Sequence, residues 1–130
     1  MKGLEMGILN GLLGNATEVK VEDLQKELNP ILADGESIEM AYKVLRDMYV
    51  FTNKRLLLID KQGLTGKKVD YHTIPYKSIS HFAVETAGHF DMDAELKIWI
   101  SSSKDPIIKT LKKGTDVVGI QKAMANFMFN

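Results

Sequence analysis

Short runs of alternating apolar and polar residues fill the chain from position 36 to position 113, and this pattern constrains the fold most. Every second residue from Ile38 to Val44 is apolar, which predicts a strand with one buried face. The run from Leu56 to Asp60 is apolar on both faces, which predicts a strand covered on both sides. Turn residues separate the runs, and the predicted strands are 38–44, 48–52, 56–60, 69–74, 79–86, 96–100 and 107–112.

Helical periodicity is confined to the two ends of the chain. Near the C-terminus an apolar stripe predicts a core-facing helix that Thr115 or Asp116 caps, and its members are Val117, Ile120, Met124, Phe127 and Met128. Residues 1–32 are predicted to form two short helices. The second is indicated by an apolar stripe of Val21, Leu24, Leu28 and Ile31, and it ends near Asn29, because Pro30 disfavours helix in the residue before it.

Seven strands followed by one amphipathic helix predict a mainly β protein, a small antiparallel barrel with the helix closing an open end. At 130 residues the chain has the length of one domain. We expect a helical extension over 1–35, barrel strands over 36–113 and a capping helix over 114–130.

The charge balance and the residue types exclude several classes of function. Lys and Arg number 17 and Asp and Glu number 17, so the chain lacks the basic excess that supplies most nucleic-acid affinity, and no nucleic-acid partner is expected. Without cysteine there is no disulfide and no thiolate site. The apolar N-terminal run is far shorter than the ~20 residues that span a bilayer. A cytoplasmic location is therefore predicted.

Three segments of the sequence resemble the bacterial pleckstrin-homology domain family: VFTNKRLLLIDKQGLTGKKVDYHTIPYKSI from Val50, FAVETAGHFDMDAELKIWIS from Phe82 and KKGTD from Lys112. The resemblance covers nearly the whole chain. It implies a pleckstrin-homology-like seven-stranded barrel with a C-terminal helix. It also implies no established catalytic residue and a tendency to form homo-oligomeric rings.

Eukaryotic members of the wider fold often bind phosphoinositides through a basic pattern near their first two strands. Lys43 and Arg46 begin such a pattern here, but Met48 stands where its last basic residue belongs. The resemblance therefore does not carry lipid-headgroup binding to this chain, since a fold alone does not transfer a function.

Lysines gather around one predicted hairpin, and the set is Lys61, Lys67, Lys68 and Lys77. They form either a solvated face or a binding surface for an anionic ligand.

One histidine and three acidic residues alternate at His89, Asp91, Asp93 and Glu95, a spacing that would place them on one side of a strand. The glycine and the spaced glutamate of a calcium loop are missing, so no metal site is predicted. Neither a cofactor motif nor a nucleophile motif is present, and we expect no enzyme activity.

Trp99 is the candidate for a contact between subunits. If Leu96, Ile98 and Ile100 face the core, Lys97 and Trp99 face outward, and exposed tryptophan is typical of interfaces. The N-terminal stripe of Leu4, Ile8 and Leu12 is a second candidate. For both, packing inside one subunit is the alternative.

The sequence therefore predicts a non-catalytic interaction or scaffold module whose partner is a second copy of itself, with another protein also open. The alternative is a peripheral binder of anionic lipid or another anionic ligand through the lysine-bearing loops. For the N-terminal segment, self-packing or subunit packing ranks above membrane contact.

Overall fold

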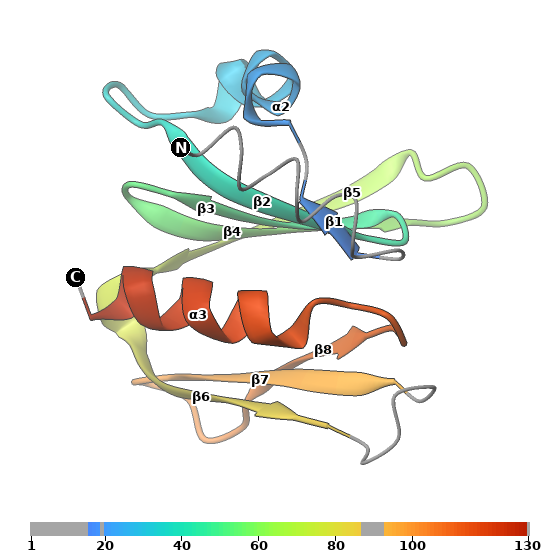
Figure 1. Cartoon of the computed structure of the whole chain (residues 1–130). Coiled ribbons are helices and arrows are strands. Elements are labelled where there is room, and N and C mark those ends of the chain that lie inside the picture. The colour runs from blue at the N-terminus through green and yellow to red at the C-terminus, as the bar shows by residue number, and fades with distance from the viewer. Residues whose placement is uncertain (1–15, 19, 87–92, 130) are drawn as a thin grey trace.

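Two antiparallel sheets and one long helix form the framework of the protein (Figure 1). The computed structural model describes residues 16–18, 20–86 and 93–129. The first sheet has the order β1-β2-β3-β4-β5, and its strands are Ala16–Glu18, Ile38–Val44, Asp47–Thr52, Arg55–Gln62 and Lys68–Pro75. The second has the order β6-β7-β8, with strands Ile79–Glu85, Ala94–Ile100 and Ile107–Leu111. Helices α2 (Val21–Leu28) and α3 (Val117–Met128) complete it, with 3-10 turns at Asn29–Ile31 and Tyr76–Ser78.

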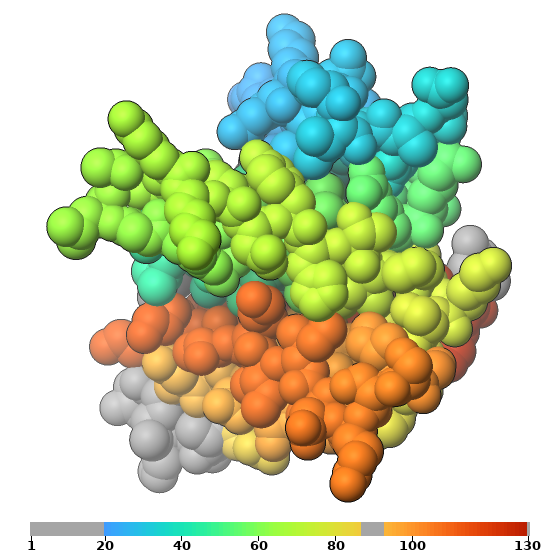
Figure 2. Space-filling model, turned by 180° about the vertical axis from the view of Figure 1, so that it is seen from behind, coloured from blue at the N-terminus to red at the C-terminus, as the bar shows by residue number. Residues whose placement is uncertain are grey.

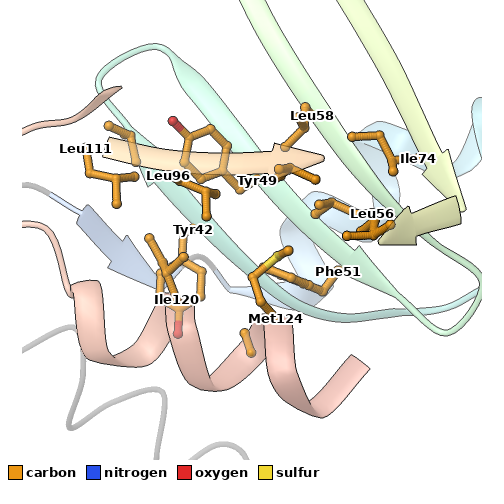
Figure 3. Close-up of a cluster of buried hydrophobic side chains, with 14 of the residues drawn as sticks. Tyr42, Tyr49, Phe51, Leu56, Leu58, Ile74, Leu96, Leu111, Ile120 and Met124 are labelled. Atoms are coloured by element: carbon orange, nitrogen blue, oxygen red, sulfur yellow. The ribbon is translucent and has the colours of Figure 1, made fainter. Parts of the chain in front are cut away.

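The middle strands of the five-stranded sheet, β2, β3 and β4, are covered on both faces. Along β4, Leu56 and Leu58 enter the main core, whereas Leu57 and Ile59 pack in a second cluster under α2. The predicted two-sided burial of this strand is therefore confirmed. Figure 3 shows the main core, where side chains of both sheets meet Ile120 and Met124 of α3.

Helix α3 lies between the two sheets and fills the space they leave (Figure 1). Its first turn is capped by Asp116, whose Oδ1 accepts a hydrogen bond from the Gly119 backbone N–H at 3.0 Å. Near its C-terminal end Phe127 stacks on Phe51 of the first sheet and on Tyr76 of the turn between the sheets, at ring-centroid distances of 5.4 and 5.5 Å. The predicted apolar stripe is core, as expected.

The predicted face of β2 is wrong at its first residue. The register against β3 shifts between Ile38 and Met40, which marks a β-bulge. An extra residue at a bulge reverses the side-chain alternation. Ile38 therefore joins Ala41 under α2, while Tyr42 and Val44 face the main core.

The N-terminal region and the barrel also differ from the prediction. Ala16–Glu18 is a strand that pairs with β2, although residues 1–32 were expected to be helical. The described chain thus has eight strands rather than seven. The strands form two separate sheets instead of a closed barrel, since β5 and β6 are not paired and the chain changes sheet at Tyr76–Ser78. The second predicted helix is confirmed as α2; the first, with its Leu4, Ile8 and Leu12 stripe, lies outside the described residues.

A buried carboxylate joins the loop after α2 to the β3–β4 turn. The Arg55 guanidinium donates to both oxygens of Glu36, at 2.8 Å from Nε and 3.0 Å from Nη2. Thr52 Oγ1 and the Ala33 backbone N–H donate to the same carboxylate at 2.7 and 2.8 Å. Burial raises the pKa of Glu36, but the hydrogen bonds from Arg55, Ala33 and Thr52 outweigh it and lower the pKa to about 2.

Candidate functional site: an uncovered sheet face and a basic hairpin

Trp99 lies on the outer face of the three-stranded sheet. Leu96 and Ile98 of the same strand are almost fully buried on the inner face, as the alternation predicts. The register places Trp99 opposite His81 of β6, and the two rings stack with centroids 4.4 Å apart and planes 15° apart. Each ring therefore covers one face of the other, and the two form a single aromatic stack on this sheet.

The outer face around Trp99 mixes apolar and charged groups. Lys97 lies opposite Ile108 of β8, whose side chain is 50% exposed. Lys97 Nζ is 3.4 Å from Glu85 Oε2 on β6. Helix α2 packs on the other sheet and α3 on the inner side, so neither described helix covers this face.

Ser80 and His81 form a serine–histidine contact beside this surface. Ser80 Oγ lies 3.1 Å from His81 Nδ1, a distance at which an imidazole can activate a hydroxyl. The same hydroxyl donates to the Trp99 carbonyl oxygen at 3.2 Å. Within the described chain no carboxylate is hydrogen-bonded to His81, so the orienting third group of a nucleophilic site is missing.

The four lysines predicted as a group do not all lie close together. Lys61, Lys67 and Lys68 lie at the β4–β5 hairpin, where Lys61 pairs with Val69 and Gln62 with Lys68. Lys77 lies in the 3-10 turn that follows the opposite end of β5. The structure therefore divides the predicted group into three lysines and a distant fourth.

Arg46 joins the hairpin in place of Lys77. It lies in the β2–β3 turn, and its Nη1 donates to the Gly63 carbonyl oxygen at 2.6 Å. This bond brings two turns of the first sheet together. Lys43 and Arg46 were visible in the sequence, but nothing there showed that the turn of Arg46 contacts the hairpin of Lys67 and Lys68.

Both turns expose a leucine. Leu64 at the hairpin tip is fully exposed, and Leu45 in the neighbouring turn is 63% exposed. Leu45 also has a φ of +58°, in the left-handed region that bulky residues rarely adopt. Two apolar side chains are thus held in water beside a group of cations, where they contribute nothing to the core.

Acidic groups lie close to this basic surface but are occupied. Asp47 accepts a hydrogen bond from the Lys61 backbone N–H at 3.2 Å, and burial together with the neighbouring Asp60 raises the pKa of Asp47.

In the predicted acidic row, Asp93 accepts from Lys112 Nζ and from the Lys113 backbone N–H at 3.2 and 3.0 Å. His89 and Asp91 lie outside the described residues. Elsewhere, the described chain has no group of three or more potential metal ligands.

The two-sheet architecture with a C-terminal helix defines a pleckstrin-homology-like fold, and the comparisons identify the family. The model of the bacterial PH domain family matches residues 7–128. The chain therefore belongs to the bacterial PH domain family. No helix among the described residues is long and apolar enough to cross a membrane.

Solved structures and curated relatives agree with this assignment. A pleckstrin-homology domain from Shewanella amazonensis SB2B is 62% identical, covers 95% of this chain and 100% of that one, and superposes with a TM-score of 0.85. A DUF1696 family protein with a pleckstrin-homology domain from Shewanella loihica PV-4 is 69% identical over 88% of this chain and 98% of that one, with a TM-score of 0.77. The uncharacterized protein YjqA of Bacillus subtilis (strain 168) is 54% identical over 92% of this chain and 97% of its own length.

Proposed function

We propose that this domain is a non-catalytic interaction module that self-associates through the outer face of its three-stranded sheet. One observation carries the proposal: Trp99, half-buried and stacked on His81, lies on an outer sheet face on which neither described helix packs. Buried aromatic residues dominate the energetics of protein contacts, and a buried tryptophan contributes roughly 150–250 Å² of area. The lack of cysteine fits a reducing compartment, so the cytoplasm is the proposed location.

The charges around Trp99 favour a second copy as the partner. Lys97 forms an ion pair with Glu85, and the β6–β7 register places Glu85 opposite Glu95. A face that carries both signs is complementary to itself, because rotation by two-fold symmetry brings a cation of one copy to an anion of the other. The neutral net charge of the chain also leaves no overall repulsion between copies.

Absolute mass measured by size-exclusion chromatography with light scattering tests this proposal. We expect the wild type to have a multiple of the monomer mass and Trp99→Ala to have a smaller mass. Thr110→Ala is the matched control, because Thr110 is exposed on the same face, opposite Glu95, but presents little apolar area. A wild type that stays monomeric at high concentration refutes self-association. A multimer that Trp99→Ala leaves intact moves the contact elsewhere.

A second function is favoured by the basic hairpin. Arg46 adds to Lys61, Lys67 and Lys68 at one end of the first sheet, and the exposed Leu64 lies among them. We propose that this surface binds an anionic bilayer, with lysine charges near the headgroups and Leu64 at the acyl boundary. Basic residues near an anionic membrane contribute about 1 kcal/mol each, and an inserted apolar side chain adds its burial.

Cosedimentation with vesicles tests this second function. Binding to vesicles that contain phosphatidylserine, compared with pure phosphatidylcholine, should fall with salt, because screening shortens electrostatic reach to ~8 Å at physiological ionic strength. The Lys67→Glu/Lys68→Glu variant should lose binding, and Leu64→Ser should weaken it. Lys77→Glu is the control, since Lys77 lies beyond the opposite end of β5. Equal loss in the control rejects the hairpin as the binding surface, and no binding by the wild type rejects the bilayer as the ligand.

A further inference from the structure

The basic hairpin carries two aspartates at its foot. The β4–β5 hairpin projects from one side of the molecule, and its yellow-green residues stand out at the left of Figure 2. Asp47 follows Arg46 directly in the chain, and Asp60 directly precedes Lys61. Continued by one position, the β3–β4 register sets Asp47 opposite Asp60. Two carboxyl groups therefore lie next to the cations that are proposed to bind a bilayer.

Each carboxyl group of this pair accepts a hydrogen bond from β4. The Lys61 backbone N–H donates to Asp47 Oδ1 at 3.2 Å, and Gln62 Nε2 donates to Asp60 Oδ2 at 3.3 Å. Both aspartates are half-buried. Two neighbouring carboxylates repel each other, whereas a protonated carboxyl group can donate a hydrogen bond to the other. The arrangement therefore favours one proton held between the two groups.

The other charged and titratable groups around this pair come from three strands. Asp70 of β5 lies opposite Asp60 and adds a further negative charge. Lys109 of β8 is a cation that favours the charged form of Asp47. Tyr49 of β3 stays neutral, because burial together with Asp47 and Asp60 raises the pKa of its hydroxyl. Burial and Asp60 outweigh Lys109 and the backbone hydrogen bond, so the pKa of Asp47 lies above its ordinary value.

An anionic bilayer at the basic hairpin would add a negative potential beside this pair. That potential disfavours the charged form of Asp47 and favours the protonated one. By linkage, protonation of Asp47 strengthens bilayer binding by the same factor. As the pH falls through the raised pKa of Asp47, one negative charge is lost and the affinity for anionic lipid rises.

We infer that the Asp47–Asp60 pair regulates the bilayer binding proposed for the basic hairpin, because the pair takes up a proton when the domain binds an anionic membrane. This inference rests on that second proposed function and adds its control. Mild acid strengthens the contact with the bilayer, and neutral pH weakens it. The proton returns to water when the domain leaves the membrane.

Cosedimentation with phosphatidylglycerol vesicles tests this regulation, because the phosphodiester of this lipid keeps its charge between pH 7 and pH 4.5. Asp47→Asn removes one negative charge at neutral pH and keeps an acceptor oxygen for the Lys61 N–H. At pH 7 the variant should bind roughly fivefold more tightly than the wild type, which is the effect of one charge near an anionic membrane. The two dissociation constants should converge as the pH falls.

Asp105→Asn is the matched control, with the same substitution at the other end of the molecule. Asp105 lies in the turn between β7 and β8. The Ser101 N–H of that turn donates to the Ser78 carbonyl oxygen at 2.8 Å, and Ser78 lies beyond the end of β5 that is opposite to the hairpin. This control should keep the wild-type dissociation constant and its pH dependence.

Titration calorimetry counts the protons directly. Measured at pH 5.5 in two buffers of different ionisation enthalpy, the binding enthalpy of the wild type should differ between the buffers, which reports proton uptake. Asp47→Asn should take up fewer protons than the wild type. A purely structural effect of the substitution would change the affinity but leave the number of protons unchanged.

The outcomes separate this inference from the proposed function. Convergence of the two dissociation constants, together with a proton uptake that Asp47→Asn reduces, supports the regulation. A ratio of dissociation constants that stays the same at every pH, or equal proton uptake by both proteins, overturns the inference and leaves bilayer binding by the hairpin standing. If Asp47→Asn does not fold, Asp60→Asn carries the same expectations. A wild type that binds no vesicle at any pH overturns both.

Discussion

Replacing Glu36 with glutamine removes the negative charge that holds Arg55, Thr52 and the loop after α2 together. The side chain of Glu36 is 1% exposed and that of Arg55 19%, so the remaining guanidinium stays largely buried without its counter-ion. The Gln amide nitrogen also adds a donor where the carboxylate had only acceptors. Loss of stability, rather than loss of the fold, is expected.

Two estimates of the magnitude agree. The pKa of Glu36 falls from an ordinary 4.5 to about 2 in the folded protein. At 1.36 kcal/mol per pKa unit, that difference corresponds to about 3 kcal/mol of folding free energy at neutral pH. Removing one partner of a buried ion pair typically costs roughly 3–5 kcal/mol, and the partial exposure of Arg55 favours the lower end. We therefore expect Glu36→Gln to lose about 3 kcal/mol at pH 7.

Urea unfolding at several pH values measures this loss and its cause. A depressed folded-state pKa gives stability that is present above pH 4.5 and is lost as the pH falls toward 2. The difference between wild type and Glu36→Gln should therefore shrink over that interval. Glu27→Gln, on the exposed side of α2, is the control and should change little. A difference at pH 7 that stays constant down to pH 2 refutes an electrostatic origin.

Three further substitutions follow from the packing. Leu57→Ala empties a fully buried position between the first sheet and α2 and should cost about 2–5 kcal/mol by chemical denaturation. Gly119→Ala should lower the melting temperature despite the better helix propensity of alanine, because the added Cβ would clash with the Asp116 carboxylate that caps the helix and would lie 2.8 Å from Tyr42 Oη. Asp47→Asn should stabilise the domain at pH 7, because one of two adjacent carboxylates, Asp47 and Asp60, is removed. That gain should vanish at low pH, where the raised pKa leaves Asp47 protonated. A variant that is less stable than the wild type at pH 7 would contradict the repulsion between Asp47 and Asp60.

Periodicity predicted those parts of the fold where burial alone decides the structure. Helix α3 and the two-sided strand β4 each bury a continuous apolar pattern, so their faces could be read from residues such as Leu57 and Ile120. The outward position of Trp99 followed from the same alternation.

What the sequence could not predict depends on pairing between distant segments. Strand β1 is only three residues long and is formed by its antiparallel pairing with β2. No local pattern in the sequence predicts that pairing. The bulge before Met40 leaves the apolar alternation of the sequence unchanged while it turns Ile38 to the other face. The position of Arg46 beside Gly63 depends on a single side-chain hydrogen bond between two turns, and it became visible only in three dimensions.

The chain passes from the first sheet to the second once, at Tyr76–Ser78, and this turn divides the described polypeptide into two segments. Every sheet ladder of the described chain lies wholly before that turn or wholly after it. Breaking the backbone there severs no ladder, and the two pieces keep complementary halves of the main core, with α3 in the second piece. The domain is therefore suited to work as a split protein, in which two separately expressed fragments regain the native structure only when they meet.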